Sequence, residues 1–250
     1  MAAHFPLKLI HSRALAPSIH HFVFRRDDGE ALAFIPGQFI QIHFSYPDGS
    51  PTKRSYSIAT VREAAASPDD PIEVAVSYVP GGAASELFGQ LREGQQIDAS
   101  GPFGRFCLMP ADANRRYLLI ATGTGVTPYR AMLPLLRQAI SERGVEVVLL
   151  FGARSPVELL YGDEFAAFAK ANPGFRFIPC FSREPALDDA FPEQRRGYVQ
   201  DALASLAPDP EHDLAYLCGN PDMVDAAFEM LKGFALPVPH IRREKYVSSR

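Results

Sequence analysis

The chain has 250 residues, of which 47% are hydrophobic, and its formal net charge is −4. This length suits one large or two ordinary domains, and the hydrophobic fraction excludes disorder as a description of the whole chain. The negative charge argues against a nucleic-acid partner, because proteins present a basic face to nucleic acids.

Cysteine spacing and hydropathy narrow the class of protein further. The chain has three cysteines far apart, in no metal-ligand spacing, so we expect no metal site and no iron–sulfur cluster within it. Residues 1–15 lack the apolar core of a signal peptide, and no apolar run is long enough to span a bilayer. We therefore expect a soluble, cytoplasmic monomer with no membrane partner.

The first hundred residues contain short runs typical of β-strands, separated by turns rich in Pro, Asp and Gly. Strands at this spacing indicate an antiparallel barrel or sandwich. The expected strands are residues 5–14, 19–25, 37–44, 53–60, 72–79 and 95–99, with one short helix at 83–91.

Beyond residue 110 the pattern changes to alternating strands and helices, which predicts a parallel sheet. A proline inside the first of these helices, Pro134, predicts a kink or a short first segment. The expected strands are residues 117–121, 145–151, 175–181 and 214–218, and helices are expected around 132–140, 163–171, 199–206 and 221–231. The predicted fold class is α+β with two domains. An antiparallel β-barrel (1–110) is followed by an α/β parallel-sheet nucleotide-binding domain (111–250).

A cation, an aromatic ring and two hydroxyl groups alternate along one expected strand, at Arg54, Ser55, Tyr56 and Ser57. Period-two geometry puts Arg54 and Tyr56 on one face and the serines on the other. A guanidinium binds phosphate through forked hydrogen bonds, and a tyrosine ring stacks on flat ligands. The alternative is an ordinary half-exposed strand.

A second phosphate contact is expected where Gly82, Ala84 and Ser85 open the short helix. Free amides at a helix start bind anions, and Ser85 adds a hydroxyl group. A plain turn and cap is the alternative for this segment alone. Two phosphate contacts that flank an aromatic ring indicate a dinucleotide.

The loop Gly123-Thr124-Gly125 follows the first buried strand of the second half and opens a helix. Glycines there let the backbone approach a pyrophosphate, whose charge the helix dipole favours. Pro128 stands where the full dinucleotide motif has its third glycine, which argues against an ordinary Rossmann dehydrogenase.

Three further strands end in candidate ligand groups, because open α/β sheets bind ligands beyond the carboxyl ends of their strands. Cys218 ends the fourth strand and is expected to face that crevice, although a small buried cysteine is a common alternative. Arg154 follows the second strand, and Ser182 and Arg183 follow the third. A hydroxyl group beside guanidinium groups suits a 2′-phosphate, hence NADP rather than NAD, whereas each arginine alone is typical of an ordinary surface.

Taken together, these motifs resemble those of the ferredoxin–NADP reductase family, over essentially the whole chain. The resemblance accounts for Pro128, because this family reads pyrophosphate with Gly-x-Gly-x-x-Pro. The matching motifs, in the family's order, are Arg54-x-Tyr56-Ser57, Gly82-x-x-Ser85, Gly123-Thr124-Gly125-x-x-Pro128, Ser182-Arg183-Glu184, Cys218-Gly219 and Glu244-x-Tyr246.

The resemblance implies FAD in the β-barrel and NADP(H) on the α/β domain. The residues it implies for FAD are Arg54, Ser55, Tyr56, Ser57, Val76, Gly82, Ala84, Ser85, Thr124 and Tyr246. Those it implies for NADP are Gly123, Gly125, Pro128, Arg154, Ser182, Arg183, Cys218 and Met223. Ser57, Cys218 and Glu244 would be catalytic, and residues 247–250 would extend past Tyr246 toward the adenine side of FAD.

The implied activity is electron exchange between NADPH and a one-electron carrier, ferredoxin or flavodoxin, by hydride transfer between nicotinamide and flavin N5. We expect basic groups to steer an acidic carrier, namely Lys53, Arg242, Arg243 and Lys245. The alternatives are the reductase component of an oxygenase, an NAD(P)H flavin reductase and, third, a flavin-binding regulatory module without turnover.

Overall fold

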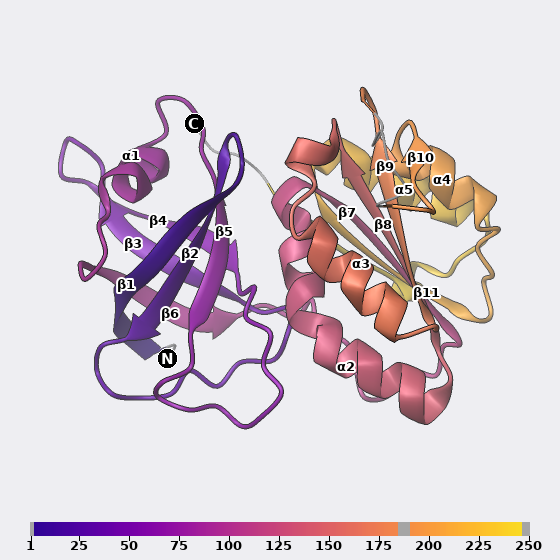
Figure 1. Cartoon of the computed structure of the whole chain (residues 1–250), viewed down its shortest axis with the longest axis horizontal. Coiled ribbons are helices and arrows are strands. Elements are labelled where there is room, and N and C mark those ends of the chain that lie inside the picture. Colours follow the sequence, from indigo (N-terminus) through magenta and orange to yellow (C-terminus); the bar gives the residue numbers. More distant parts are fainter. Residues whose placement is uncertain (1–2, 185–190, 247–250) are drawn as a thin grey trace. The chain divides into compact units, whose positions relative to one another are not determined.

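The computed structural model describes residues 3–184 and 191–246, so the predicted extension at 247–250 lies outside the described residues (Figure 1). The chain divides into two compact units. One comprises Met1–Leu108 with Thr127–Pro134, and the other comprises Met109–Val126 with Leu135–Val247. Each unit contains a six-stranded sheet.

The first unit is an antiparallel barrel in the strand order β4-β3-β6-β1-β2-β5. Its two edge strands meet through a bridge between Ile58 and Val74 and a 2.7 Å hydrogen bond from Ala59 N to Glu73 O, which closes the sheet. The elements are β1 (Ala3–Ala16), β2 (Ile19–Arg26), β3 (Phe39–Ser45), β4 (Pro51–Ser57), β5 (Ile72–Ser77), α1 (Ala83–Gln90) and β6 (Gln96–Phe103).

Apolar side chains fill the interior of this barrel. They alternate with polar ones along each strand, because successive side chains of a strand point to opposite faces. In β1, for example, Phe5, Leu7 and Leu9 are buried, whereas the residues between them are more exposed. The helix α1 contributes Phe88, which is buried in the same cluster of apolar side chains.

The second unit has a fully parallel sheet in the order β10-β9-β8-β7-β11-β12. The strands are β7 (Arg116–Thr122), β8 (Glu146–Ala153), β9 (Phe175–Phe181), β10 (Arg195–Arg196), β11 (Asp213–Gly219) and β12 (Ile241–Lys245). The helices are α3 (Gly162–Ala171), α4 (Val199–Ser205), α5 (Pro221–Gly233) and the part of α2 (Thr127–Arg143) that follows Pro134. Short 3₁₀ turns lie at Gly123–Val126, Pro156–Glu158 and Val238–His240. The predicted two-domain fold class is confirmed.

Both faces of the parallel sheet are buried, as its nearly continuous apolar strands predict. Alternate side chains of β7, β8, β9 and β11 pack against α4 and α5, and α3 lies on the opposite face (Figure 1). The order of strands reverses between β7 and β11, since β8 lies on one side of β7 and β11 on the other. Ligands of open α/β sheets bind at such a switch point.

Of the two alternatives predicted at Pro134, a kink or a short first segment, the short first segment is wrong. Helix α2 runs from Thr127 to Arg143 with Pro134 inside it. A proline in a helix interior costs about 3 kcal/mol, and burial of Met132 and Leu136 on either side of it offsets that cost.

Two strands were not expected from the sequence. β10 has only two residues, and four of the five residues of β12 are charged. Both lie at the edges of the sheet, where one side needs no apolar cover. None of the described helices has the length and apolarity needed to cross a membrane.

Candidate cofactor sites and active-site residues

The guanidinium of Arg54 is positioned by neighbours on β3 and β4. It donates to the Tyr46 hydroxyl at 3.0 Å, to Thr52 Oγ1 at 3.0 Å and to Lys53 O at 2.9 Å. Its carbon lies 5.9 Å from the centre of the Phe44 ring. A guanidinium has five N–H donors, so these three bonds hold Arg54 in place and leave donors for a phosphate.

Tyr56 and Ser57 follow at the end of β4. The Tyr56 ring is half-buried and contacts Phe88 edge-to-face, with 5.3 Å between ring centres. Burial raises the pKa of Tyr56 above its ordinary value, so this phenol remains neutral. Ser57 is buried, with 6% of its surface exposed, whereas Ser55 is exposed.

The start of α1 is a tight turn, in which Gly82 N donates to Val79 O at 2.9 Å. A Cβ atom on Gly82 would lie 3.1 Å from Val79 O, so the turn leaves little room for a side chain there. Val79 N donates to Ser85 Oγ at 2.7 Å, which fixes the turn and leaves the hydroxyl hydrogen of Ser85 able to donate. The amides of the first turn, Ala84 included, have no partner within the helix. The side chain of Val76 is buried, so its contact with a ligand would use the backbone.

Two glycines in the second unit bring the ends of β7 and β11 together. A Cβ atom on Gly125 would overlap the carbonyl oxygen of Cys218, and one on Gly219 would lie 2.5 Å from Thr122 O. Pro128 lies in the first turn of α2, directly after this loop. The close backbone approach and the helix start fit a bound pyrophosphate.

The other predicted residues of this edge surround the same loop. Gly123 and Thr124 lie in the 3₁₀ turn between β7 and α2. Met223 is buried in the first turn of α5, where its N–H donates to Asn220 Oδ1 at 3.3 Å.

Cys218, Glu244 and Tyr246 form one cluster across β11 and β12. Cys218 and Glu244 are paired in the parallel register, and Tyr246 N donates to Gly219 O at 2.8 Å. Burial raises the pKa of Glu244 to about 7, so this carboxyl group exchanges a proton near neutral pH. Burial, and next the charge of Glu244, raise the pKa of the Cys218 thiol well above its ordinary value. The thiol is fully buried, which agrees with the alternative of a small buried cysteine at the strand end.

The loops after β8 and β9 bring Arg154, Ser182 and Arg183 together. Ser182 N donates to Ala153 O at 3.1 Å, and Arg183 N donates to Arg154 O at 3.0 Å. The guanidinium of Arg154 is already paired, since its Nε donates to Glu158 Oε2 at 2.7 Å and its Nη2 lies 2.5 Å from Oε1. The sequence placed these residues at one sheet edge but gave no sign of this ion pair.

Three residues of this corner were not singled out as ligands from the sequence. Arg195 and Arg196 form β10, which pairs with the end of β9, and Tyr198 follows with 64% of its surface exposed. The basic pair is visible in the sequence, but only the two-residue strand places it beside Ser182 and Arg183. Two arginines and an exposed ring there suit the anionic, aromatic end of a nucleotide.

Part of the predicted carrier-docking set is wrong. Arg242 is half-buried, and its guanidinium donates to both carboxylate oxygens of Asp112, at 2.8 and 2.5 Å. Lys245 is paired with Asp225 at 2.7 Å. Arg242 therefore serves the fold of the second unit rather than an exposed docking surface.

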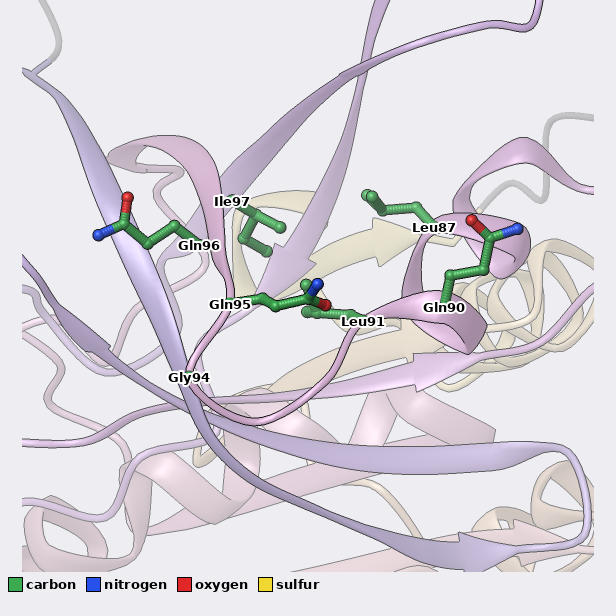
Figure 2. A pocket seen from close by; sticks show the side chains of 7 residues that line it. All are labelled: Leu87, Gln90, Leu91, Gly94, Gln95, Gln96 and Ile97. Atoms are coloured by element: carbon green, nitrogen blue, oxygen red, sulfur yellow. The ribbon is translucent and has the colours of Figure 1, made fainter.

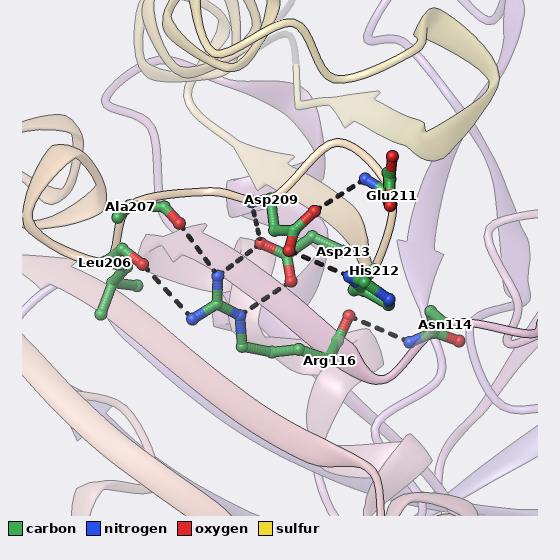
Figure 3. A network of polar contacts seen from close by, with 8 residues as sticks. All are labelled: Asn114, Arg116, Leu206, Ala207, Asp209, Glu211, His212 and Asp213. Atoms are coloured by element: carbon green, nitrogen blue, oxygen red, sulfur yellow. Dashed lines mark hydrogen bonds and ion pairs between the residues drawn. The ribbon is translucent and has the colours of Figure 1, made fainter.

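Two other features lie apart from the predicted residues. A hollow of about 610 Å³ lies between the C-terminal half of α1 and the start of β6. Figure 2 shows the residues that line it, which are Leu87, Gln90, Leu91, Gly94, Gln95, Gln96 and Ile97. Figure 3 shows a network at the amino ends of β7 and β11, where Arg116 Nε donates to Asp213 Oδ1 at 2.8 Å. Asp213 is buried, so this network is structural.

The sequence matches two families along its two halves. Residues 6–107 match the oxidoreductase FAD-binding domain, and residues 119–229 match the oxidoreductase NAD-binding domain. The chain is 34% identical to ferredoxin–NADP reductase B of Sorangium cellulosum over 97% of both chains. It is 35% identical to the reductase subunit of an aromatic O-demethylase of Amycolatopsis, over 87% of this chain and 62% of that one.

Solved structures agree with this assignment. A cytochrome P450 reductase of Amycolatopsis superposes with a TM-score of 0.83 at 30% identity, covering 99% of this chain and 71% of that one. A ferredoxin–NADP⁺ reductase of Neisseria gonorrhoeae, at 24% identity and with a TM-score of 0.79 over 98% of this chain and 99% of that one, shares the fold. The chain is thus an oxidoreductase with FAD- and NAD-binding domains, and it belongs to the ferredoxin–NADP reductase family.

Proposed function

We propose that this oxidoreductase exchanges electrons between NADPH and a small one-electron carrier, ferredoxin or flavodoxin. The observation that carries the choice of carrier is the match to ferredoxin–NADP reductase B, which extends over 97% of both chains. The aromatic O-demethylase subunit is matched over 62% of its length. FAD, when bound, accepts a hydride and releases its two electrons one at a time.

The proposed FAD site uses residues of 1–110. Arg54 and the amides at the start of α1 would hold the pyrophosphate, because both present N–H donors to an anion. Tyr56 would stack on the isoalloxazine ring, and Ser57 would hydrogen-bond near its N5 atom. The half-buried, neutral Tyr56 ring beside Phe88 supports the stacking role.

The proposed NADPH site uses residues of 111–250, and the strand order suggests how the coenzyme lies. The pyrophosphate loop follows β7, and the corner of Arg154, Ser182 and Arg183 follows β8 and β9, one and two strands away. Neighbouring strands are about 5 Å apart, which suits the reach from a pyrophosphate to a 2′-phosphate. The nicotinamide half would then point the other way, toward Cys218 on β11.

Glu244 is proposed to hold or release a proton, and Tyr246 to give a second stacking ring. A carboxyl group with a pKa of about 7 carries its proton for about half of the time at neutral pH. That makes Glu244 suited to a proton-handling role in both directions of electron flow. We also place the protein in the cytoplasm as a monomer.

The deciding experiment is anaerobic stopped-flow reduction of the FAD-loaded protein by NADPH and by NADH. Candidate ferredoxins and flavodoxins are then added to the reduced protein. We expect faster reduction by NADPH and rapid oxidation by at least one carrier. Preference for NADH would overturn the coenzyme assignment.

The second candidate function is the reductase component of an oxygenase. It is favoured by relatives such as the aromatic O-demethylase subunit, whose identity of 35% is close to the 34% of the ferredoxin–NADP reductase. Slow transfer to every free carrier, with rapid transfer to an oxygenase partner, would select this candidate.

A further inference from the structure

We propose that Glu158 sets the coenzyme selectivity of this protein by competing with the 2′-phosphate of NADPH for Arg154. This inference rests on the proposed NADPH site, and it concerns a residue that the sequence motifs do not include. Glu158 ends the 3₁₀ turn Pro156–Glu158, four residues after Arg154.

The first observation is the geometry of the pair. Arg154 Nε donates to Glu158 Oε2 at 2.7 Å, and Arg154 Nη2 lies 2.5 Å from Oε1, so the carboxylate occupies one forked edge of the guanidinium. A phosphate prefers the same planar, two-point contact. With Glu158 in place, an incoming phosphate meets a neutral pair, not a free cation.

The second observation is the position of this pair at the coenzyme corner. The Arg154 carbonyl oxygen accepts from the N–H groups of both Arg183 and Glu184, at 3.0 and 3.1 Å. The backbone of Arg154 is therefore fixed beside Ser182 and Arg183. Any change at Glu158 acts on a guanidinium whose main chain stays in place.

The third observation is the chemistry of the two partners. In dinucleotide-binding α/β folds, an acidic side chain near the end of the second strand accepts a hydrogen bond from the ribose 2′-hydroxyl of NAD, and an arginine receives the 2′-phosphate of NADP. This chain has both types after its second parallel strand, β8. The Glu158 carboxylate therefore offers an acceptor to a 2′-hydroxyl group and repels a 2′-phosphate.

The expected size of the effect of Glu158 on coenzyme preference follows from the exposure of the two paired side chains. The side chain of Arg154 is 55% exposed and that of Glu158 is 23% exposed, so water screens their attraction. We expect Glu158 to narrow the preference for the phosphorylated coenzyme about three- to tenfold, as for a partly exposed charge-assisted contact.

The test compares binding of 2′,5′-ADP and 5′-AMP to the FAD-loaded protein by calorimetry. In Glu158→Gln the ratio of their affinities should rise about three- to tenfold, with 2′,5′-ADP bound more tightly and 5′-AMP more weakly. Glu158→Asp, which keeps the charge, should stay close to the wild type. A merely structural role of Glu158 would move both affinities together and leave the ratio unchanged, and that result would overturn the inference.

Two further variants sharpen the test. In an Arg154→Gln background, Glu158→Gln should no longer raise the affinity for 2′,5′-ADP, because the guanidinium that the substitution would release is absent. A higher affinity in this background would contradict the proposed competition for Arg154. Glu229→Gln removes a carboxylate paired with Lys232 on α5 and should leave the ratio unchanged. If the wild type itself binds 5′-AMP as tightly as 2′,5′-ADP, the proposed NADPH preference falls. If the wild type binds 2′,5′-ADP more tightly than 5′-AMP but Glu158→Gln shows the same ratio of affinities, only the proposed role of Glu158 is contradicted.

Discussion

Glu244 lies half-buried on the edge strand β12, and its chemistry depends on that burial. The same burial, together with the charge of Glu244, keeps the neighbouring Cys218 as a neutral thiol. Ser57, in the first unit, is also buried, which suits a hydroxyl group that must hold one orientation. At the scale of single residues, then, removal from water tunes both acidity and orientation.

Replacing Glu244 should change how stability depends on pH. Burial raises its pKa from 4.5 to about 7, so between these values the unfolded chain loses a proton that the folded protein keeps. The contribution of Glu244 is therefore fully present below pH 4.5 and is lost as the pH rises through about 7, a loss of about 3 kcal/mol. In Glu244→Gln, the urea midpoint should fall less between pH 5 and pH 8 than in the wild type.

The control for this variant is Glu229→Gln on α5, whose carboxylate is exposed. It should retain the wild-type decline with pH. An equal decline in Glu244→Gln would show that burial of this carboxyl group does not govern the pH dependence.

Replacing Ser57 by alanine should slow reduction of FAD by NADPH about tenfold or more, while FAD remains bound. The proposed reason is loss of a hydroxyl group that orients the flavin for hydride transfer, where small misplacements are costly. Stopped-flow absorbance gives the rate, and the flavin-to-protein ratio gives the FAD content. Ser45→Ala, at the exposed end of β3, is the matched control. An unchanged rate in Ser57→Ala would remove this role.

Whole elements position the nucleotide loops. The ends of β7 and β11 approach so closely that Gly125 and Gly219 have no room for a side chain. The sequence motif identified Gly125 from its place between a strand and a helix. The structure adds the reason, which is contact with the carbonyl oxygen of Cys218 on the neighbouring strand.

Gly125→Ala should weaken binding of 2′,5′-ADP at least tenfold without loss of FAD. Its Cβ atom would overlap the Cys218 carbonyl oxygen, so the loop must move away from the strand end. Calorimetry measures the affinity, and thermal unfolding reports any loss of stability. Gly233→Ala is the control, because a Cβ atom there would meet nothing within 4 Å. Wild-type affinity in Gly125→Ala would contradict the proposed pyrophosphate loop.

The whole molecule consists of two units with separate apolar cores. The proposed FAD residues come chiefly from the barrel, and the proposed NADPH residues come from the parallel sheet. Binding of either cofactor should therefore stabilise chiefly the unit that holds it, because a ligand stabilises the fold that binds it.

Removal of FAD should lower the thermal midpoint of the barrel. A ligand present at 100 times its dissociation constant stabilises a fold by about 2.7 kcal/mol. The chain has no tryptophan, so circular dichroism is the appropriate measurement. In Arg54→Gln the gain on adding FAD should shrink, because the proposed phosphate contact is lost. A midpoint independent of FAD would argue against the barrel as its site.

Much of the fold could be predicted from local patterns. Alternation along β1 and continuous apolar runs such as β7 predicted strands whose centres agree with the structure. The edges were harder, because β12 (Ile241–Lys245) is mostly charged and resembles a loop. Its strand conformation depends on the hydrogen-bonding partner that β11 supplies.

The candidate site divides in the same way. The order of motifs, the family and the glycine loops could be read from the sequence, because each depends on residues adjacent in the chain. The folded structure was needed to show that Glu158 forms an ion pair with Arg154, that Arg242 forms one with Asp112 and that Glu244 lies beside Cys218. Ion pairs and burial depend on which distant side chains the fold brings together and on how much water it leaves around them, and residue order alone does not specify these quantities.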